Sequence, residues 1–214
     1  MDQQDHIVFI VDDDPGVRES LSALLSSADM QAVSFGSASD YLAYAKPDLP
    51  SCLVLDVDLP DINGLEFQGR ISEHEEHPPI VFITGHGDIP SSVRAIKAGA
   101  LDFLTKPFKD TDLLFAIEGA LAQSRKERLV RAQLADLRHR FSTLTPRERE
   151  LLPLIVGGLL NKQAAAMLGI SEVTTQIHRG HIMQKMRAES LPELVRMADL
   201  LEIPINHSRH GNVK

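Results

Sequence analysis

The sequence predicts a small doubly wound α/β domain followed by an all-helical domain. In the first half of the 214-residue chain, short runs of branched and aromatic residues alternate with stretches of helical period. Such runs are typical of buried parallel strands joined by crossover helices. After Leu144 every segment has helical character, and a chain of this length has room for two modest domains.

The first half contains five expected strands, each followed by an expected helix. The strands are Ile7–Val11, Gln31–Phe35, Leu53–Leu55, Ile80–Ile83 and Phe103–Thr105. The helices are Gly16–Ser27, Ser37–Tyr44, Gly64–Ser72, Ile89–Ala98 and Asp110–Ala122. Because a helix that joins two parallel strands crosses over with right-handed geometry, this alternation predicts one open sheet with helices on both faces.

A linker helix is expected next, over Gln123–Phe141, where the composition changes to Arg, Lys, Gln, Leu and Ala without Gly or Pro. Its apolar residues form a narrow stripe with steps of four and three: Val130, Leu134, Leu137, Phe141 and Leu144. This stripe suits a helix that packs on a neighbour. A short dimeric coiled coil is an alternative, although two heptads are too few to establish one.

Four further helices are expected in the second half. The first begins at the capping box Thr145-Pro146-Arg147-Glu148 and ends near Gly157, with Pro153 predicting a kink inside it. The second is Asn161–Leu168, the third runs from Ser171 to Met186, and the fourth runs from the capping box at Ser190 to Leu201. We therefore divide the chain into residues 1–122, a linker helix at 123–141, a helical domain at 142–204 and a loose tail at 205–214.

The charge is distributed unevenly between the two halves. Residues 1–122 contain 7 Lys and Arg against 21 Asp and Glu, a net charge of −14, whereas residues 123–214 contain 15 against 9, a net charge of +6. This asymmetry suggests that the second half meets a polyanion, and a solvated helical surface is the alternative. No apolar run reaches the roughly 18 residues of a membrane span, and the single Cys52 excludes an internal disulfide, so we expect a cytoplasmic protein with no membrane partner.

Reactive side chains follow four of the expected strands. Asp12 and Asp13 follow the first, Asp56 the third, Thr84 the fourth and Lys106 the fifth. In an open parallel sheet such groups gather outside the carboxyl ends of the strands. Paired carboxylates favour Mg²⁺, with Mn²⁺ as an alternative, and a carboxylate can attack phosphorus. Each residue alone could equally be a helix cap or part of a turn, but four successive positions favour a phosphoryl pocket.

Four segments resemble the receiver domain of two-component response regulators over about residues 5–122: VDDD at 11–14, LDVDLPDINGLE at 55–66, ITGHGD at 83–88 and KAGALDFLTKPF at 97–108. The resemblance implies a flavodoxin-like sheet of order 2-1-3-4-5 and phosphorylation of Asp56 by a sensor histidine kinase. It also implies that Asp13, Asp56 and the backbone carbonyl of Asp58 hold Mg²⁺, with Asp12 acting through water.

The same resemblance implies a switch. Thr84 and Phe103 would be the switch pair, and phosphorylation would turn the face formed by 89–98 and 101–105 into a homodimer surface. Asp58 and His86 would tune the lifetime of the phosphoryl group, which the receiver itself can slowly hydrolyse.

The second half resembles the LuxR-type helix-turn-helix DNA-binding domain. The segments that carry this resemblance are LTPRERELL at 144–152, GLLNKQAAAMLGIS at 158–171 and VTTQIHRGHIMQKM at 173–186, over about residues 141–202. A receiver joined to this domain is similar to the FixJ/NarL subfamily, and GHGDIP with DFLTKPF is most similar to FixJ. The implied partners are promoter DNA and RNA polymerase.

Helical spacing divides the expected recognition helix into two faces. Thr175, Ile182 and Met186, with Arg179 or His178 between them, fall on the face toward the bundle. Val173, Gln176, Ile177 and Gly180 fall on the opposite face, toward a major groove. The base-reading positions of the family match Gln176, Ile177 and Gly180. The expected phosphate contacts are Asn161, Lys162, Thr174, His178, Arg179 and Lys185, and a packing role for the His178 ring is the alternative.

Two other functions are weaker alternatives. Haloacid-dehalogenase-type phosphatases also combine an Asp-x-Asp motif, a Thr or Ser, a Lys and Mg²⁺. Their acid pair follows the Lys in chain order, however, whereas Asp12 and Asp13 precede Asp56, and Pro60 stands where those enzymes usually have Thr or Val. A receiver that serves only as a protein adaptor does not account for the LuxR-type half. We therefore expect a phosphorylation-activated transcription regulator rather than an enzyme.

Overall fold

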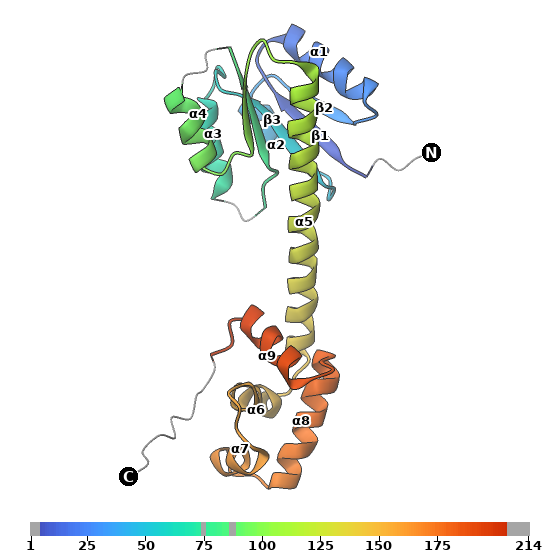
Figure 1. The fold of residues 1–214 in the computed structure, drawn as a ribbon, viewed down its shortest axis with the longest axis vertical. Coiled ribbons are helices and arrows are strands. Elements are labelled where there is room, and N and C mark those ends of the chain that lie inside the picture. Colours follow the sequence, from blue (N-terminus) through green and yellow to red (C-terminus); the bar gives the residue numbers. More distant parts are fainter. Residues whose placement is uncertain (1–4, 74–75, 86–88, 205–214) are drawn as a thin grey trace. The chain divides into compact units, whose positions relative to one another are not determined.

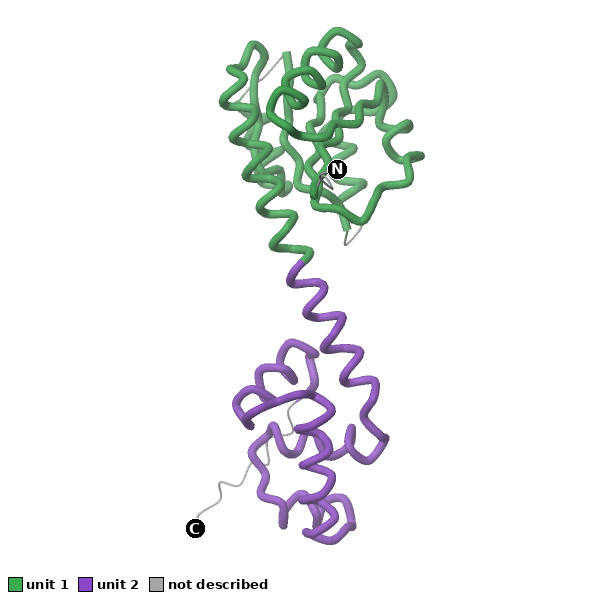
Figure 2. The backbone as a smooth tube through the Cα atoms, turned by 90° about the vertical axis from the view of Figure 1, so that its right-hand side faces the viewer, with its two compact units in different colours: residues 1–128 green, residues 129–214 purple. Residues whose placement is uncertain are grey.

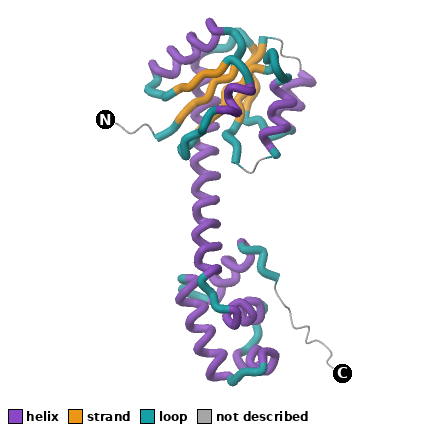
Figure 3. The backbone as a smooth tube through the Cα atoms, turned by 180° about the vertical axis from the view of Figure 1, so that it is seen from behind, coloured by secondary structure: helices purple, strands orange, loops and turns teal. Residues whose placement is uncertain are grey.

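The computed structural model describes residues 5–73, 76–85 and 89–204, which form two compact units that divide after Arg128 (Figure 2). The first unit contains a five-stranded parallel sheet, and the second contains only helices apart from its connecting loops (Figure 3). The predicted pairing of an α/β domain with an all-α domain is confirmed. Among the described residues, no helix combines the length and the apolar character that crossing a membrane requires.

The sheet has the strand order β2-β1-β3-β4-β5, as predicted. The strands are β1 (Ile7–Val11), β2 (Ala32–Phe35), β3 (Ser51–Asp56), β4 (Ile80–Thr84) and β5 (Asp102–Thr105). Every neighbouring pair is parallel, with Val11 opposite Leu55 and Asp56 opposite Ile83. Strand β3 is longer than expected because Ser51 and Cys52 pair with Ile7 and Val8 of β1, although no apolar run marks Ser51 in the sequence.

Alternate residues of the strands fill two separate cores. Phe9, Leu53 and Phe82 lie on one face under α2 (Ala38–Ala43), α3 (Gly64–Ser72) and α4 (Ile89–Lys97). Val8, Val54 and Val81 lie on the other face under α1 (Pro15–Ser27) and the first part of α5 (Asp110–Ser142). Because both faces are covered, the strands have the continuous apolar sequences of a buried parallel sheet (Figure 1).

Helix α5 is the main difference from the expected elements. We predicted a helix at Asp110–Ala122 and a separate linker helix at Gln123–Phe141, whereas α5 is continuous over 33 residues from Asp110 to Ser142. The junction contains no Pro or Gly, so nothing in the backbone interrupts the helix there. Of the predicted apolar stripe, Leu137, Phe141 and Leu144 join the core of the second unit, but Val130 is exposed.

The second unit is built from the end of α5 and four helices: α6 (Pro146–Val156), α7 (Asn161–Leu168), α8 (Glu172–Met186) and α9 (Leu191–Leu200). The predicted capping box is present at Thr145, whose hydroxyl accepts from the Glu148 backbone while the Glu148 carboxylate accepts from the Thr145 backbone. Gly169 ends α7 with a left-handed φ of 66°, and Ser171 caps α8. Helix α6 continues through Pro153 to Val156, and the kink predicted there stays a prediction.

Candidate functional site

The carboxyl ends of β1, β3 and β5 bring two buried acids to one lysine. The Lys106 ammonium donates to Asp12 Oδ2 at 2.7 Å and to Asp56 Oδ1 at 2.9 Å. Both carboxylates are almost fully buried, whereas Asp13 is exposed beside them. The strand register explains this convergence, because Asp12 directly follows β1 and Asp56 ends the neighbouring β3.

Burial and hydrogen bonding have opposite effects on this cluster. Burial raises the pKa of the Asp56 carboxyl above its ordinary value, and the Lys106 ammonium and the Asp58 backbone N–H only partly offset that rise. For Lys106, burial lowers the pKa, but the hydrogen bonds that its ammonium donates to Asp12 and Asp56 outweigh that effect, so the pKa is raised overall. Lys106 thus pairs with two carboxylates at once, and its single positive charge neutralises Asp56 only in part.

Backbone groups fix both acids in place. The Asp14 N–H donates to Asp12 Oδ1 at 2.9 Å, and the Asp58 N–H donates to Asp56 Oδ2 at 2.7 Å. The Arg18 guanidinium donates to the carbonyl oxygens of Asp12 and Asp13 at 2.8 and 2.9 Å. Sequence reasoning missed Arg18, because nothing distinguishes it from any other arginine in the first turns of an amphipathic helix.

The loop after β3 approaches the pocket closely. Asp58 pairs with Asn63 in an isolated antiparallel bridge, and the Gly64 N–H donates to the Val57 carbonyl at 2.8 Å. A Cβ atom on Gly64 would lie 3.0 Å from Val57 Cα and closer still to the Asp56 carbonyl oxygen. Only glycine therefore allows α3 to begin against the end of β3. The importance of Gly64 was also missed from the sequence.

The two predicted switch residues lie on neighbouring strands. Thr84 is fully buried at the end of β4, and Phe103 in β5 is partly buried, with its ring 6.0 Å from the Phe82 ring. Phe103 also lines a cavity of about 410 Å³ together with residues of α4, among them Val93 and Ile96. His86, predicted to tune phosphoryl lifetime, lies outside the described residues.

The side chains of the pocket suit a hard divalent cation. Asp12, Asp13 and Asp56 supply only oxygen atoms, which is the ligand chemistry that Mg²⁺ prefers. The unit charge of Lys106 neutralises only part of the charge of these acids. The buried Cys52 has no part in such a site, and burial raises the pKa of its thiol, as expected for a small core residue.

The recognition helix shows the two predicted faces. Thr175, Ile182 and Met186 are buried, and the Thr175 hydroxyl donates to the Ser171 carbonyl at 3.1 Å. Val173, Gln176, Ile177 and Gly180 are exposed. An exposed apolar side chain such as Ile177 suits contact with a thymine methyl group, and a glutamine can pair with adenine.

Several predicted phosphate contacts are engaged within the second unit. Arg179 donates to the Asn161 side chain at 3.3 Å, and Lys185 donates to the buried Glu148 carboxylate at 2.7 Å. Thr174 shares a hydrogen bond with Ser171, and Lys162 is exposed. His178 is half-buried, with its Nδ1 atom enclosed by protein, which agrees with the packing alternative for its ring.

Comparison with known proteins identifies both halves. Residues 8–118 match the family described as response regulator receiver domain, and residues 142–198 match bacterial regulatory proteins of the luxR family. Nodulation protein W of Bradyrhizobium diazoefficiens is 49% identical over 207 residues, which cover 97% of this chain and 91% of the relative. The transcriptional regulatory protein FixJ of Rhizobium meliloti is 43% identical, over 91% of this chain and 95% of its own length.

A solved structure agrees across both halves. The response regulator StyR superposes with a TM-score of 0.80 at 46% identity, covering 91% of this chain and 98% of that protein. These matches place the chain among transcription regulators and not among haloacid-dehalogenase-type phosphatases. The chain therefore belongs to the two-component response regulators of the FixJ/NarL subfamily, which join a receiver domain to a LuxR-type DNA-binding domain.

Proposed function

We propose that Asp56 accepts a phosphoryl group from a sensor histidine kinase and that this modification controls promoter binding through α8. The observation that carries the proposal is the Lys106 ammonium, which bridges buried Asp12 and Asp56 at the carboxyl ends of the strands. A receiver domain implies a kinase partner, and a LuxR-type domain implies DNA.

In the proposed reaction an Asp56 oxygen bonds to phosphorus while the phosphorus–nitrogen bond of a phosphohistidine breaks. The leaving imidazole nitrogen takes up a proton, so charge and atoms balance. Receiver domains generally use Mg²⁺ for this step, and here Asp13, Asp56 and the Asp58 carbonyl would hold the ion while Asp12 assists through water. The ion would supply positive charge for the phosphoryl oxygens. Lys106 already contacts Asp56 and can follow the new phosphoryl group.

Phosphorylation would then change the face formed by residues 89–98 and 101–105, which contains α4 and β5. The Thr84 hydroxyl would move toward the phosphoryl group, and the Phe103 ring would turn into the space that is vacated. Ile89, Val93, Ile96 and Leu101 are exposed apolar residues of this face, a composition suited to a second copy of the chain. We propose that the phosphorylated protein is a homodimer, that it slowly hydrolyses its own acyl phosphate, and that it recruits RNA polymerase at its promoters.

DNA recognition would use the exposed face of α8. Gln176 and Ile177 would contact base edges, while Gly180 would let the helix approach closely. Lys162, Thr174, His178, Asn161 and Arg179 would contact phosphates. Lys185 is ion-paired with Glu148, so we infer that its main role is to hold α8 against α6. We also propose that Lys185 contacts a phosphate.

Intact-mass measurement with acetyl phosphate and Mg²⁺ tests the phosphoacceptor. The protein should gain the mass of one phosphoryl group, and Asp56→Asn should gain none. The matched control Asp58→Asn should still be modified, because only its backbone carbonyl is assigned to the site. Modification of the Asp56→Asn variant would contradict the proposal.

Sedimentation and promoter binding test the switch. Beryllofluoride, a phosphoryl mimic, should shift the wild-type protein from monomer to dimer and raise its promoter affinity. The Asp56→Asn variant should show neither change. Equal promoter affinity with and without beryllofluoride in both proteins would remove the switch while leaving phosphorylation of Asp56 intact.

A further inference from the structure

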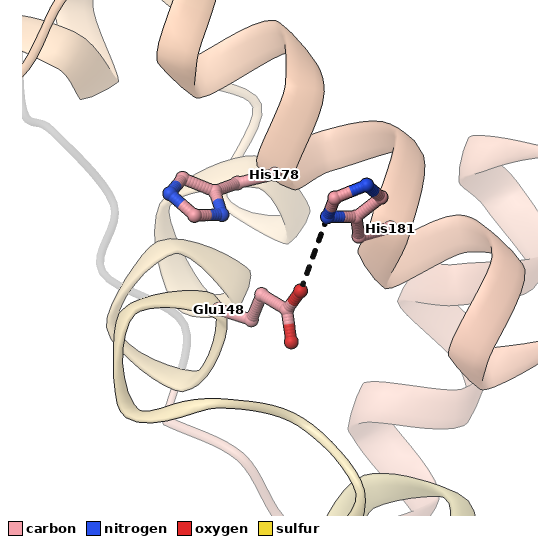
Figure 4. A group of neighbouring side chains, drawn as sticks. All are labelled: Glu148, His178 and His181. Atoms are coloured by element: carbon pink, nitrogen blue, oxygen red, sulfur yellow. Dashed lines mark ion pairs between the residues drawn. The ribbon is translucent and has the colours of Figure 1, made fainter.

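Two histidines and a glutamate form a cluster in the second unit, which contains none of the receiver-pocket residues. Each of Glu148, His178 and His181 offers a ligand atom, and these atoms all lie within 4.8 Å of one another. Figure 4 shows both imidazole rings extending from α8 and the Glu148 carboxylate extending from α6 toward the same space. His178 and His181 are three positions apart, so the two rings lie on one side of the helix.

We propose that Glu148, His178 and His181 form a binding site for a transition-metal ion of the zinc class. Two imidazole nitrogens and one carboxylate oxygen are an established protein ligand set for Zn²⁺, whose bonds to these atoms are about 2.0–2.2 Å long. A tetrahedral ion with such bonds needs ligand atoms about 3.3–3.6 Å apart. The present separations therefore require a closure of about 1 Å or slightly more, which rotation of the His181 ring can supply because that side chain is 54% exposed.

The His178 ring gives independent support for a missing partner. Its Nδ1 atom is buried and has no hydrogen-bond partner among the described residues. A buried polar atom without a partner is costly to the fold, and a metal bond to this nitrogen would remove that cost.

Glu148 can bind an ion without losing its present contacts. Its Oε2 atom accepts from Lys185 at 2.7 Å and from the Thr145 N–H at 2.8 Å. Its Oε1 atom faces the histidines, 3.6 Å from His181 Nδ1. Lys185 would share the carboxylate with the metal, so its charge weakens binding but does not block the oxygen that faces the site.

The ligand chemistry separates this site from the receiver pocket. Imidazole nitrogens favour Zn²⁺, Ni²⁺ and Cu²⁺, whereas Mg²⁺ requires oxygen ligands. The site would join α6 to the recognition helix α8, so a bound ion would stabilise their mutual packing. Water can complete the coordination from the exposed side at His181.

Equilibrium dialysis of the full chain with Zn²⁺, in excess Mg²⁺ that occupies the receiver pocket, tests the proposal. Wild type should bind one Zn²⁺, and His181→Asn should weaken that binding at least about tenfold, since even outer-shell changes cost that much. The control His139→Asn removes an exposed histidine of α5 and should bind as wild type does. A second control replaces His207 and His210, which lie outside the described residues, and should also leave binding unchanged.

Thermal unfolding provides a second readout. Zn²⁺ bound to the folded state should raise the unfolding temperature of the wild type and of both controls, but not of His181→Asn or His178→Asn. Far-UV circular dichroism of the metal-free variants establishes that they remain folded. Equal Zn²⁺ affinity in His181→Asn and wild type, or loss of binding in the tail variant, overturns the proposal.

Discussion

The glycine that begins α3 allows the sharpest test of how the phosphoacceptor is positioned. Intrinsic helix propensity alone predicts that Gly64→Ala stabilises the protein by about 1 kcal/mol. The structure predicts the opposite, because a Cβ atom would lie 3.0 Å from Val57 Cα and 3.2 Å from the Asp56 carbonyl carbon. These are backbone atoms of Asp56, which ends β3, and of the next residue, so no side-chain rotation can relieve the clash.

The matched control lies in the same helix. A Cβ atom on Gly69 meets nothing within 4 Å, so Gly69→Ala should gain about 0.5–1 kcal/mol from helix propensity. Overpacking against a well-packed interior costs about 1–3 kcal/mol, which makes Gly64→Ala less stable than wild type. Both substitutions gain helix propensity, so the two variants should differ by the overpacking cost alone, about 1–3 kcal/mol in free energy of unfolding.

The sequence offers a probe that reports on the receiver alone. The chain has no Trp and two Tyr, and both tyrosines, Tyr41 and Tyr44, lie in the first unit. Urea unfolding followed by tyrosine fluorescence therefore measures this unit within the full chain. A shift of the Asp56 backbone should also slow modification by acetyl phosphate by up to about 100-fold, because small misplacements of reacting groups are costly. If Gly64→Ala matched Gly69→Ala in both stability and rate, the close approach would not matter.

Three further predictions concern buried charge and DNA reading. Burial raises the pKa of Asp56, so above the ordinary pKa of 3.8 the charged carboxylate opposes folding. Asp56→Asn should therefore stabilise the Mg²⁺-free receiver at pH 7 and lose that advantage below pH 3.8. Urea unfolding across this pH range measures the effect. Burial raises the pKa of Glu148, but hydrogen bonds from Lys185 and the Thr145 backbone outweigh that effect, so the pKa is lowered overall. The charged carboxylate should therefore stabilise the second unit above pH 4.5, and this stabilisation should be lost as the pH falls through the lowered pKa. Glu148→Gln should cost about 1–3 kcal/mol at pH 7, measured by hydrogen exchange in α6. Gln176→Ala should weaken specific DNA binding by about tenfold in fluorescence anisotropy, whereas Gln184→Ala, an exposed glutamine later in α8, should not.

The fold and the convergence of Asp12, Asp56 and Lys106 could be predicted because they follow from local patterns. Apolar runs located the strands, and the rule for parallel sheets then brought Asp12, Asp56 and Lys106 together without any knowledge of distances. The capping residues Thr145 and Ser171 located the starts of α6 and α8, because each cap is a hydrogen bond between residues only three positions apart in the sequence. Inside and outside faces of α8 followed from helical periodicity.

The features that the sequence did not predict depend on contacts between residues far apart in the chain, or on backbone geometry that no sequence pattern marks. A change of composition at Gln123 suggested a boundary, but composition does not end a helix, and α5 continues. The Glu148–Lys185 pair joins residues 37 positions apart on different helices, so no spacing rule finds it. Arg18 donates to the Asp12 carbonyl, and Gly64 lies against the Asp56 carbonyl. No sequence pattern predicts the direction in which a backbone carbonyl points, so neither contact could be foreseen.

The two units use the same pair of groups, a buried carboxylate and a lysine, with opposite electrostatic results. Glu148 Oε2 accepts from Lys185 and from the Thr145 backbone N–H, and the pKa of Glu148 is lowered. This pair is therefore a stabilising structural contact. Asp56 shares Lys106 with Asp12, and its pKa is raised by burial that these contacts do not offset. A carboxylate that shares its lysine with a second acid gains more from an added cation than one that has a lysine to itself. The difference between the two sites thus explains why the receiver pocket, and not the Glu148–Lys185 pair, suits a reaction that depends on Mg²⁺ and adds negative charge.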